Sequence, residues 1–287
     1  MSAAAFECVS GGVLKLWAGT RPTPGLGGCW LGQAGFALRA GRKRILIDPY
    51  LSDHLAQKYR GAELPHERMM PAPIEPQALR RIDWVFCTHA HGDHMDPVTL
   101  PLIAETSPAC RFVIPAAESQ TAIDRGLPAS RLLLVSASER HTLDAGLDLA
   151  VVPAAHEERR RDARGRDHFL GYAIRHDNAC VYHSGDCVPF DSLADEVRAL
   201  DADLALLPVN GRDEKRRSRG IPGNFTFAEA VDLCETTGIA RMVPHHFGMF
   251  SFNTISQNDL DAYLVRFADR LRIEPPRLDT HWFIRRP

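Results

Sequence analysis

The feature that most constrains this chain is a run of six residues, His89-Ala90-His91-Gly92-Asp93-His94, in which four side chains are potential metal ligands. The apolar run 82–87 before it has the length of a buried strand, and Asp96-Pro97 after it is typical of a helix start. The ligands should therefore lie on a loop between a strand and a helix, where a rigid scaffold often carries binding residues. In an extended loop the first two histidines point the same way, whereas the aspartate and the third histidine turn toward a second point. The spacing predicts two metal positions close together.

Composition narrows the class of protein. The 287 residues are 45% hydrophobic and 24% charged, and the formal net charge is -2, so no global attraction to nucleic acid or an anionic membrane is expected. No apolar run has the length of a transmembrane helix, and the N-terminus lacks the features of a signal peptide. The seven cysteines show no Cys-x-x-Cys spacing, which indicates reduced thiols. We expect a cytoplasmic protein with one domain over 1–287, a small-molecule substrate, and no nucleic-acid or membrane partner. Composition leaves open whether it forms a homo-oligomer.

Two kinds of pattern follow one another along the chain. The first predicts strands at 13–17, at 29–39 with breaks at Gly32 and Gly35, and at 44–48, joined by short turns as in an antiparallel sheet. From residue 82 onward strands alternate with helices: strands at 82–87, 111–114, 132–135, 147–152, 169–175, 180–183, 204–207, 240–243 and 281–284, and helices at 116–125, 192–200, 227–236 and 257–271. Residues 1–12 look weakly ordered. The irregular segment 49–76 is either a surface excursion or a lid over a substrate.

Three further groups of potential ligands stand at the ends of predicted strands. His156 follows the strand 147–152, Asp186 follows a strand and a glycine that permits a sharp turn, and His245-His246 follow the strand 240–243. A sheet would deliver each of these side chains to its edge. Taken alone, His156 could equally be an exposed loop residue.

These motifs resemble the metallo-β-lactamase superfamily, whose signature is His-x-His-x-Asp-His. A closer similarity is to the L-ascorbate-6-phosphate lactonase branch, carried by residues 78–83, Tyr182-His183-Ser184-Gly185-Asp186 and Arg219-Gly220-Ile221. The resemblance implies an α/β fold, a four-layer αββα sandwich of two mixed β-sheets flanked by helices, with the site along the upper edge of the strands. It also favours a lid at 49–76, where the resembled lactonases carry an insertion.

The resemblance further implies how the ligands are shared between two divalent metal ions. One ion would take His89, His91 and His156, the other Asp93, His94 and His246, and Asp186 would bridge them. His246 is preferred to His245 because it stands directly before an aromatic residue, Phe247. His156 is the least secure ligand, because the resembled lactonases do not always keep a histidine there.

The expected function is that of a binuclear metal-dependent hydrolase. A hydroxide that two Zn or Mn ions make available would attack a carbonyl carbon. The favoured reaction is opening of a small, anionic, sugar-derived lactone. Asp93 would be catalytic by orienting the nucleophile and carrying a proton, and Arg219, His245 and Asn210 would contact the substrate. Arg219 precedes Thr226, a potential N-cap, and guanidinium suits an anionic group; the alternative is that Arg219 points to solvent.

Two other functions remain open. A phosphodiesterase or nuclease would use the same pair of metals, but the balanced charge offers no broad basic face for it. A metal-binding protein without turnover would keep the same ligands. A redox role of the flavodiiron type is disfavoured, because that branch has Glu where His91 stands.

Overall fold

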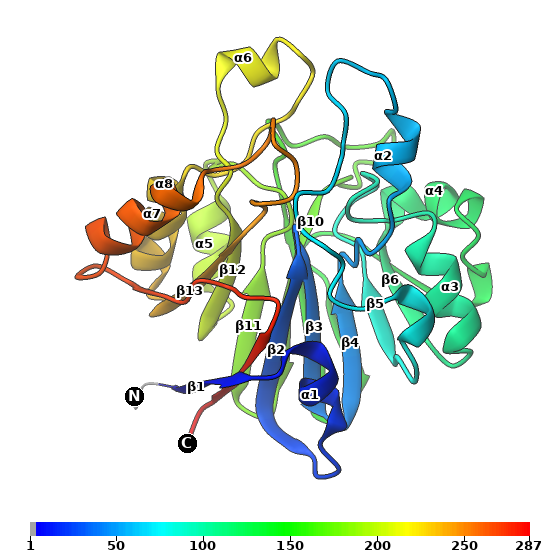
Figure 1. The fold of residues 1–287 in the computed structure, drawn as a ribbon. Coiled ribbons are helices and arrows are strands. Elements are labelled where there is room, and N and C mark those ends of the chain that lie inside the picture. Colours follow the sequence, from blue (N-terminus) through cyan, green and yellow to red (C-terminus); the bar gives the residue numbers. More distant parts are fainter. Residues whose placement is uncertain (1–3) are drawn as a thin grey trace.

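Two β-sheets packed face to face form the centre of the protein, and helices cover their outer faces (Figure 1). The structure is a computed structural model and describes residues 4–287. The first sheet has the strand order β1-β15-β2-β3-β4-β5-β6-β7, and the second β14-β13-β12-β11-β10-β9-β8. Both sheets mix parallel and antiparallel neighbours. The predicted αββα sandwich of two mixed sheets is confirmed.

The strands of each sheet have the following bounds. The first sheet contains β1 (Ala5–Ser10), β2 (Thr23–Gly32), β3 (Gly35–Gly41), β4 (Lys43–Ile47), β5 (Trp84–Phe86), β6 (Arg111–Pro115), β7 (Leu132–Val135) and β15 (Thr280–Arg285). The second contains β8 (Arg140–Asp144), β9 (Leu147–Pro153), β10 (Leu170–His176), β11 (Ala179–His183), β12 (Leu204–Pro208), β13 (Arg241–His245) and β14 (Arg272–Ile273).

The helices are short and lie mainly outside the sheets. They are α1 (Gly12–Ala18), α2 (His54–Lys58), α3 (Thr99–Thr106), α4 (Ser119–Asp124), α5 (Leu193–Arg198), α6 (Glu214–Arg217), α7 (Phe227–Thr237) and α8 (Gln257–Arg266), with 3-10 turns at Pro76–Ala78, Ala116–Glu118 and Ala129–Arg131. Within residues 4–287 no helix is both long and apolar enough to cross a membrane. In Figure 1, α2 and α6 stand on two separate loops above the upper edge of the sheets.

The strand β5 shows how the sheets anchor the metal-ligand loop. The side chains of β5 and of the next residue, Cys87, alternate between the two faces: Trp84 and Phe86 pack in the core between the sheets, whereas Val85 and Cys87 pack in the layer that includes α3. All four are almost fully buried. The loop that begins at Thr88 is therefore held from both sides by well-packed side chains.

Three predictions for the N-terminal region were wrong. Residues 13–17 form the helix α1 rather than a strand, because Val13, Leu16 and Trp17 share one buried helical face while Leu14 is 64% exposed. Residues 5–10, expected to be weakly ordered, form β1 by pairing with β15, and residues 1–3 lie outside the described part. The expected strand 29–39 is a hairpin of β2 and β3 that turns at residues 33–34.

Two smaller differences concern the helix α3 and the strand β8. The helix after the ligand motif begins at Thr99, and Asp96 accepts hydrogen bonds from the backbone N–H of Val98 and the hydroxyl of Thr99 in front of it. The strand β8 was not expected, because its sequence is largely polar; it forms by pairing with β9. The segment 49–76 remains irregular apart from the single helical turn of α2.

A steric contact between β2 and β15 yields a prediction for stability. A methyl group at Gly28 would overlap the indole ring of Trp282, its partner across the two strands, because the added carbon would lie far closer to Cζ2 of the ring than van der Waals contact allows. Gly28→Ala should therefore lower the free energy of unfolding by about 1–3 kcal/mol, as overpacking usually does. Denaturant titration of Gly28→Ala with and without Trp282→Ala measures the effect, which should shrink once the ring is gone. An equal loss in both backgrounds would show that this contact is not responsible.

Candidate metal centre

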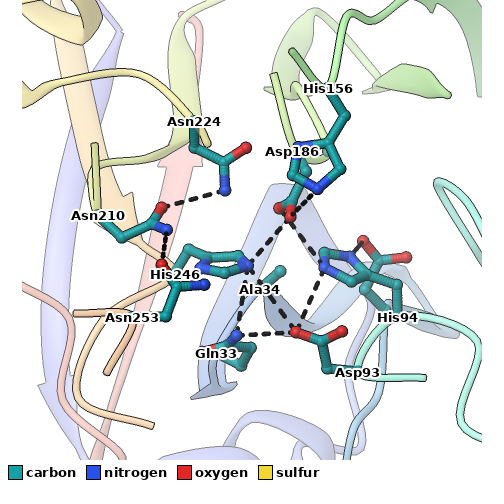
Figure 2. A network of polar contacts seen from close by, with 12 residues as sticks. Gln33, Ala34, Asp93, His94, His156, Asp186, Asn210, Asn224, His246 and Asn253 are labelled. Carbon is teal, nitrogen blue, oxygen red and sulfur yellow. Dashed lines mark hydrogen bonds and ion pairs between the residues drawn. The ribbon is translucent and has the colours of Figure 1, made fainter. Parts of the chain in front are cut away.

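Seven potential ligands from both sheets meet at the upper edge of the sandwich. Figure 2 shows Asp93, His94, His156, Asp186 and His246 among them. The first sheet supplies His89, His91, Asp93 and His94, which follow β5, and the second supplies His156, Asp186 and His246, which follow β9, β11 and β13. Parallel strands end at the same edge of their sheet, so ligands that are far apart in the sequence become neighbours. All seven are the residues that the sequence predicted as metal ligands.

The first group consists of three histidines. The potential ligand atoms of His89, His91 and His156 all lie within 4.8 Å of one another. Phe169 lies against all three rings, with ring centroids 5.2, 6.0 and 5.5 Å away. His89 and His156 are buried, whereas His91 is exposed. The group thus has an apolar wall on one side and opens toward solvent at His91.

The second group combines a carboxylate with two histidines. Oδ2 of Asp93 lies 3.8 Å from Nε2 of His94 and 3.8 Å from Nε2 of His246. Asp186 stands between the groups: its carboxylate oxygens lie 3.4 Å from His94, 3.5 Å from His156 and 3.1 Å from His246. Its position suits a ligand shared by both groups.

The geometry and the hydrogen bonding of these residues fit divalent cations. Ligands at zinc-type bond lengths in a tetrahedron are about 3.3 Å apart, close to the separations around Asp186. Nε2 of His89, Nε2 of His94 and Oδ1 of Asp186 are buried and have no hydrogen-bond partner in the described chain. Buried polar atoms without partners are destabilising, and these three converge within 4.8 Å. A cation there would satisfy them.

A second layer of residues orients the histidines. Oδ2 of Asp48 lies 2.7 Å from Nδ1 of His94 and accepts a hydrogen bond from the hydroxyl of Thr88, while its Oδ1 accepts the backbone N–H of Thr88. Nδ1 of His156 lies 3.0 Å from the carbonyl oxygen of Gly223, to which it donates. In both rings Nδ1 carries a proton and Nε2 faces the site, the arrangement found around protein metal ligands.

Burial and charge shift the pKa of several ligands before a cation binds. Burial lowers the pKa of His156 to about 4 and holds that of His89 well below its usual range, so both are neutral at pH 7. Burial would also lower the pKa of His94, but the carboxylates of Asp186, Asp48 and Asp93 outweigh it and raise this pKa well above its usual range. Protons and cations therefore compete for His94.

A cavity of about 650 Å³ lies over the ligands and is walled by two loops. One wall comes from residues 54–66, which include α2, and the other from residues 218–222, which follow α6. Arg219 links the loops at the mouth: its guanidinium lies 3.2 Å from the carboxylate of Glu63, and both side chains are largely exposed. The aromatic side chains of Tyr59, Phe250 and Phe252 also line the cavity.

The other predicted substrate residues do not line this cavity. His245 is fully buried, stacks on His183 with centroids 4.7 Å apart, and faces Phe36 in the core. Asn210 is 2% exposed and donates its amide N–H to Asn253, which does line the cavity. These positions give no support to direct substrate contact by His245 or Asn210.

The surroundings of Arg219 also differ from the expected anion corner. Thr226 caps α7 in a capping box with Glu229, as predicted. However, the carboxylate of Glu229 takes the backbone N–H of Thr226 and also pairs with Arg212. Glu229 thus places a negative charge at this helix terminus, and of Arg219 and Thr226 only Arg219 lines the cavity.

Two residues of the site were not found from the sequence. Asp48 directly follows the strand β4 and precedes a proline, and His156 and Asp186 likewise stand just after strands. Gln33 lies in the turn between β2 and β3 and donates its amide N–H to Asp93 over 2.8 Å. No motif points to Gln33, because only the three-dimensional structure brings this turn to the ligands.

Comparison with known proteins agrees with this fold. A family model described as the β-lactamase superfamily domain matches residues 43–247. The chain therefore belongs to the metallo-β-lactamase superfamily and is a metal-dependent hydrolase of that superfamily. The family resemblance predicted from the motifs is confirmed.

Individual relatives share only about a quarter of their residues with this chain. A UPF0173 metal-dependent hydrolase from Pyrobaculum aerophilum is 25% identical over 236 residues, which cover 81% of this chain and 89% of the relative. A probable L-ascorbate-6-phosphate lactonase, UlaG, from Salmonella choleraesuis is 26% identical over 274 residues, which cover 85% of this chain and 75% of the relative. The solved structure of Igni18, a metallo hydrolase from Ignicoccus hospitalis, has a TM-score of 0.65 at 20% identity and covers 90% of this chain and 98% of its own.

The adjacent histidines 245 and 246 allow a direct test of the ligand assignment. His246→Ala should reduce bound metal by about one equivalent, because its Nε2 lies 3.1 Å from Asp186 and 3.8 Å from Asp93. His245→Ala should keep its metal and lose stability instead, because the ring packs in the core. Elemental analysis and thermal melting of both variants separate the effects. The opposite pattern would mean that the wrong histidine was chosen.

Proposed function

We propose that this protein is a binuclear metal-dependent lactonase that opens a small, anionic, sugar-derived lactone. The observation that carries the proposal is the arrangement of two ligand groups around Asp186 at the floor of the cavity. Similarity to the probable L-ascorbate-6-phosphate lactonase supports the reaction class. The ligand set of nitrogen and carboxylate oxygen suits Zn, with Mn as the second candidate.

The chain's own residues divide the work as follows. His89, His91 and His156 would hold one ion, Asp93, His94 and His246 the other, and Asp186 both. When bound, two such ions supply Lewis acidity and a hydroxide nucleophile at neutral pH. Asp93 lines the cavity with a side chain that is 15% exposed, so its carboxylate can orient the attacking water and pass a proton to the leaving oxygen.

The cavity walls support a small substrate with an anionic group. Lys58 and Arg219 bring positive charge to the lining, and Glu63 is the acidic residue that faces Arg219. Tyr59, Phe250 and Phe252 give part of the wall an apolar character, as is common in ligand pockets. The enclosed volume of about 650 Å³ suits a compact ligand rather than a polymer.

A phosphodiesterase remains the second candidate, because the same cationic side chains also suit a phosphate ester. A metal-binding protein without turnover is the third. Both are distinguished from a lactonase by the same measurement.

The deciding experiment assays the metal-loaded protein against a panel of neutral and anionic lactones, phosphodiesters and β-lactams. We expect about two metal equivalents per chain and turnover of anionic lactones. Asp93→Asn keeps the shape of the side chain but removes its charge, and should lower kcat about 100-fold or more. Turnover of phosphodiesters alone would establish the second candidate, and no turnover with full metal would establish the third.

The ion pair between Arg219 and Glu63 predicts that substituting either residue changes KM, in opposite directions. Arg219→Ala should raise KM for anionic lactones about three- to tenfold, because an exposed charge contributes little more than that. Glu63→Gln should lower KM for the same substrates, because it frees Arg219 from its carboxylate partner. Steady-state kinetics on matched neutral lactones provide the control and should change little. If both substitutions act equally on neutral and anionic substrates, Arg219 does not recognise the anion.

A further inference from the structure

Gln33 occupies an unusual place in the turn between β2 and β3. Gly32 pairs with Gly35 across the hairpin, which leaves Gln33 and Ala34 as the two turn residues. The φ angle of Gln33 is +49°, in the left-handed region where tight hairpin turns favour glycine, asparagine or aspartate. Its side chain is also completely buried. A long polar side chain at such a position calls for an explanation beyond turn formation.

The side chain of Gln33 contacts two members of the second ligand group (Figure 2). Its Nε2 donates a hydrogen bond to Oδ2 of Asp93 over 2.8 Å and lies 3.3 Å from Nε2 of His246. A carboxylate can only accept, so the amide nitrogen must face Asp93. The amide keeps this orientation although its oxygen, Oε1, is buried without a partner in the described chain. The contact with Asp93 therefore determines how the amide lies.

The backbone of Gln33 also contacts His246. Its carbonyl oxygen accepts the N–H of His246 over 3.0 Å and the indole N–H of Trp30 over 2.9 Å. His246 also has a left-handed backbone, with φ +62°. Two strained residues, one from each sheet, thus meet through one hydrogen bond directly beside the ligand atoms. One residue of the first sheet fixes a ligand that the second sheet supplies.

We propose that Gln33 is a positioning residue of the second ligand group. Its amide holds Asp93 and its carbonyl holds His246, so that the two ligands face a common point before the cation arrives. The inference rests on the metal site of the proposed function. Partners of this kind around metal ligands usually change metal affinity about ten- to a hundredfold when they are removed.

The experiment compares Gln33→Gly and Gln33→Glu with the unchanged protein. Glycine preserves the carbonyl contact, relieves the left-handed backbone and removes only the amide. Glutamate keeps the shape but replaces the donor to Asp93 with an acceptor. Stepwise binding of Zn²⁺ and Co²⁺ is measured by competition with a chromophoric chelator, together with the Co²⁺ absorption spectrum and the melting temperature of the metal-free protein. In both variants we expect one of the two metal equivalents to bind about ten- to a hundredfold more weakly and the other to stay unchanged.

The melting temperature separates positioning from folding. Gln33→Gly should weaken the one metal equivalent while the metal-free protein melts within a few degrees of the unchanged one. Arg81→Gly is the matched control, because Arg81 also has a left-handed backbone, with φ +55°, but precedes β5 at the opposite edge. It should leave both equivalents unchanged. Should Gln33→Gly fail to fold, Gln33→Glu still decides the matter.

Failure of this inference is distinct from failure of the proposed function. If the unchanged protein binds two equivalents and both Gln33 variants bind them equally well, Gln33 has no positioning role. Weakening of both equivalents in parallel with a large fall in melting temperature would also overturn it, since that is the signature of a general structural role. If the unchanged protein itself binds fewer than two equivalents, the binuclear site is what fails.

Discussion

The buried carboxylate of Asp186 is the group on which the rest of the site depends. It is 3% exposed and lies within 3.5 Å of nitrogen atoms from three histidines. Burial alone would raise its pKa, but His246, His94 and His156 outweigh burial and hold the pKa well below its usual range. A buried negative charge is tolerable only when neighbouring groups compensate it, and both ligand groups lie around this one carboxylate.

Much of the fold and site could be predicted because strand ends carry a clear signal. An apolar run followed by a ligand predicted Asp186 and His246 at one sheet edge, and the structure brings both to the motif 89–94. The signal failed for residues 13–17, where a short helix buries apolar residues at a spacing that a five-residue run cannot distinguish from a strand. It was silent for Gln33, since a turn residue reveals nothing about which distant side chain it will contact.

The residues expected to contact substrate were harder to predict than the ligands, for a physical reason. Ligands are placed by strands, whereas the cavity walls are loops whose path depends on packing with one another. His245 and His246 are neighbours, yet the first points into the core and the second toward Asp186, because side chains alternate at a strand end and His246 turns into a left-handed conformation. Asn210 is likewise separated from the cavity by a neighbour, because its amide donates to Asn253 and only Asn253 lines the cavity.

The division of the ligands between the two sheets has a consequence for how the molecule unfolds. Four ligands belong to the first sheet and three to the second, so a cation held by His94 and His246 ties the sheets together as well as filling the site. The free energy of cation binding would then add to the stability of the native state, and removal of the cation would lower that stability. A chelator would therefore weaken the contact between the two sheets as well as empty the metal site.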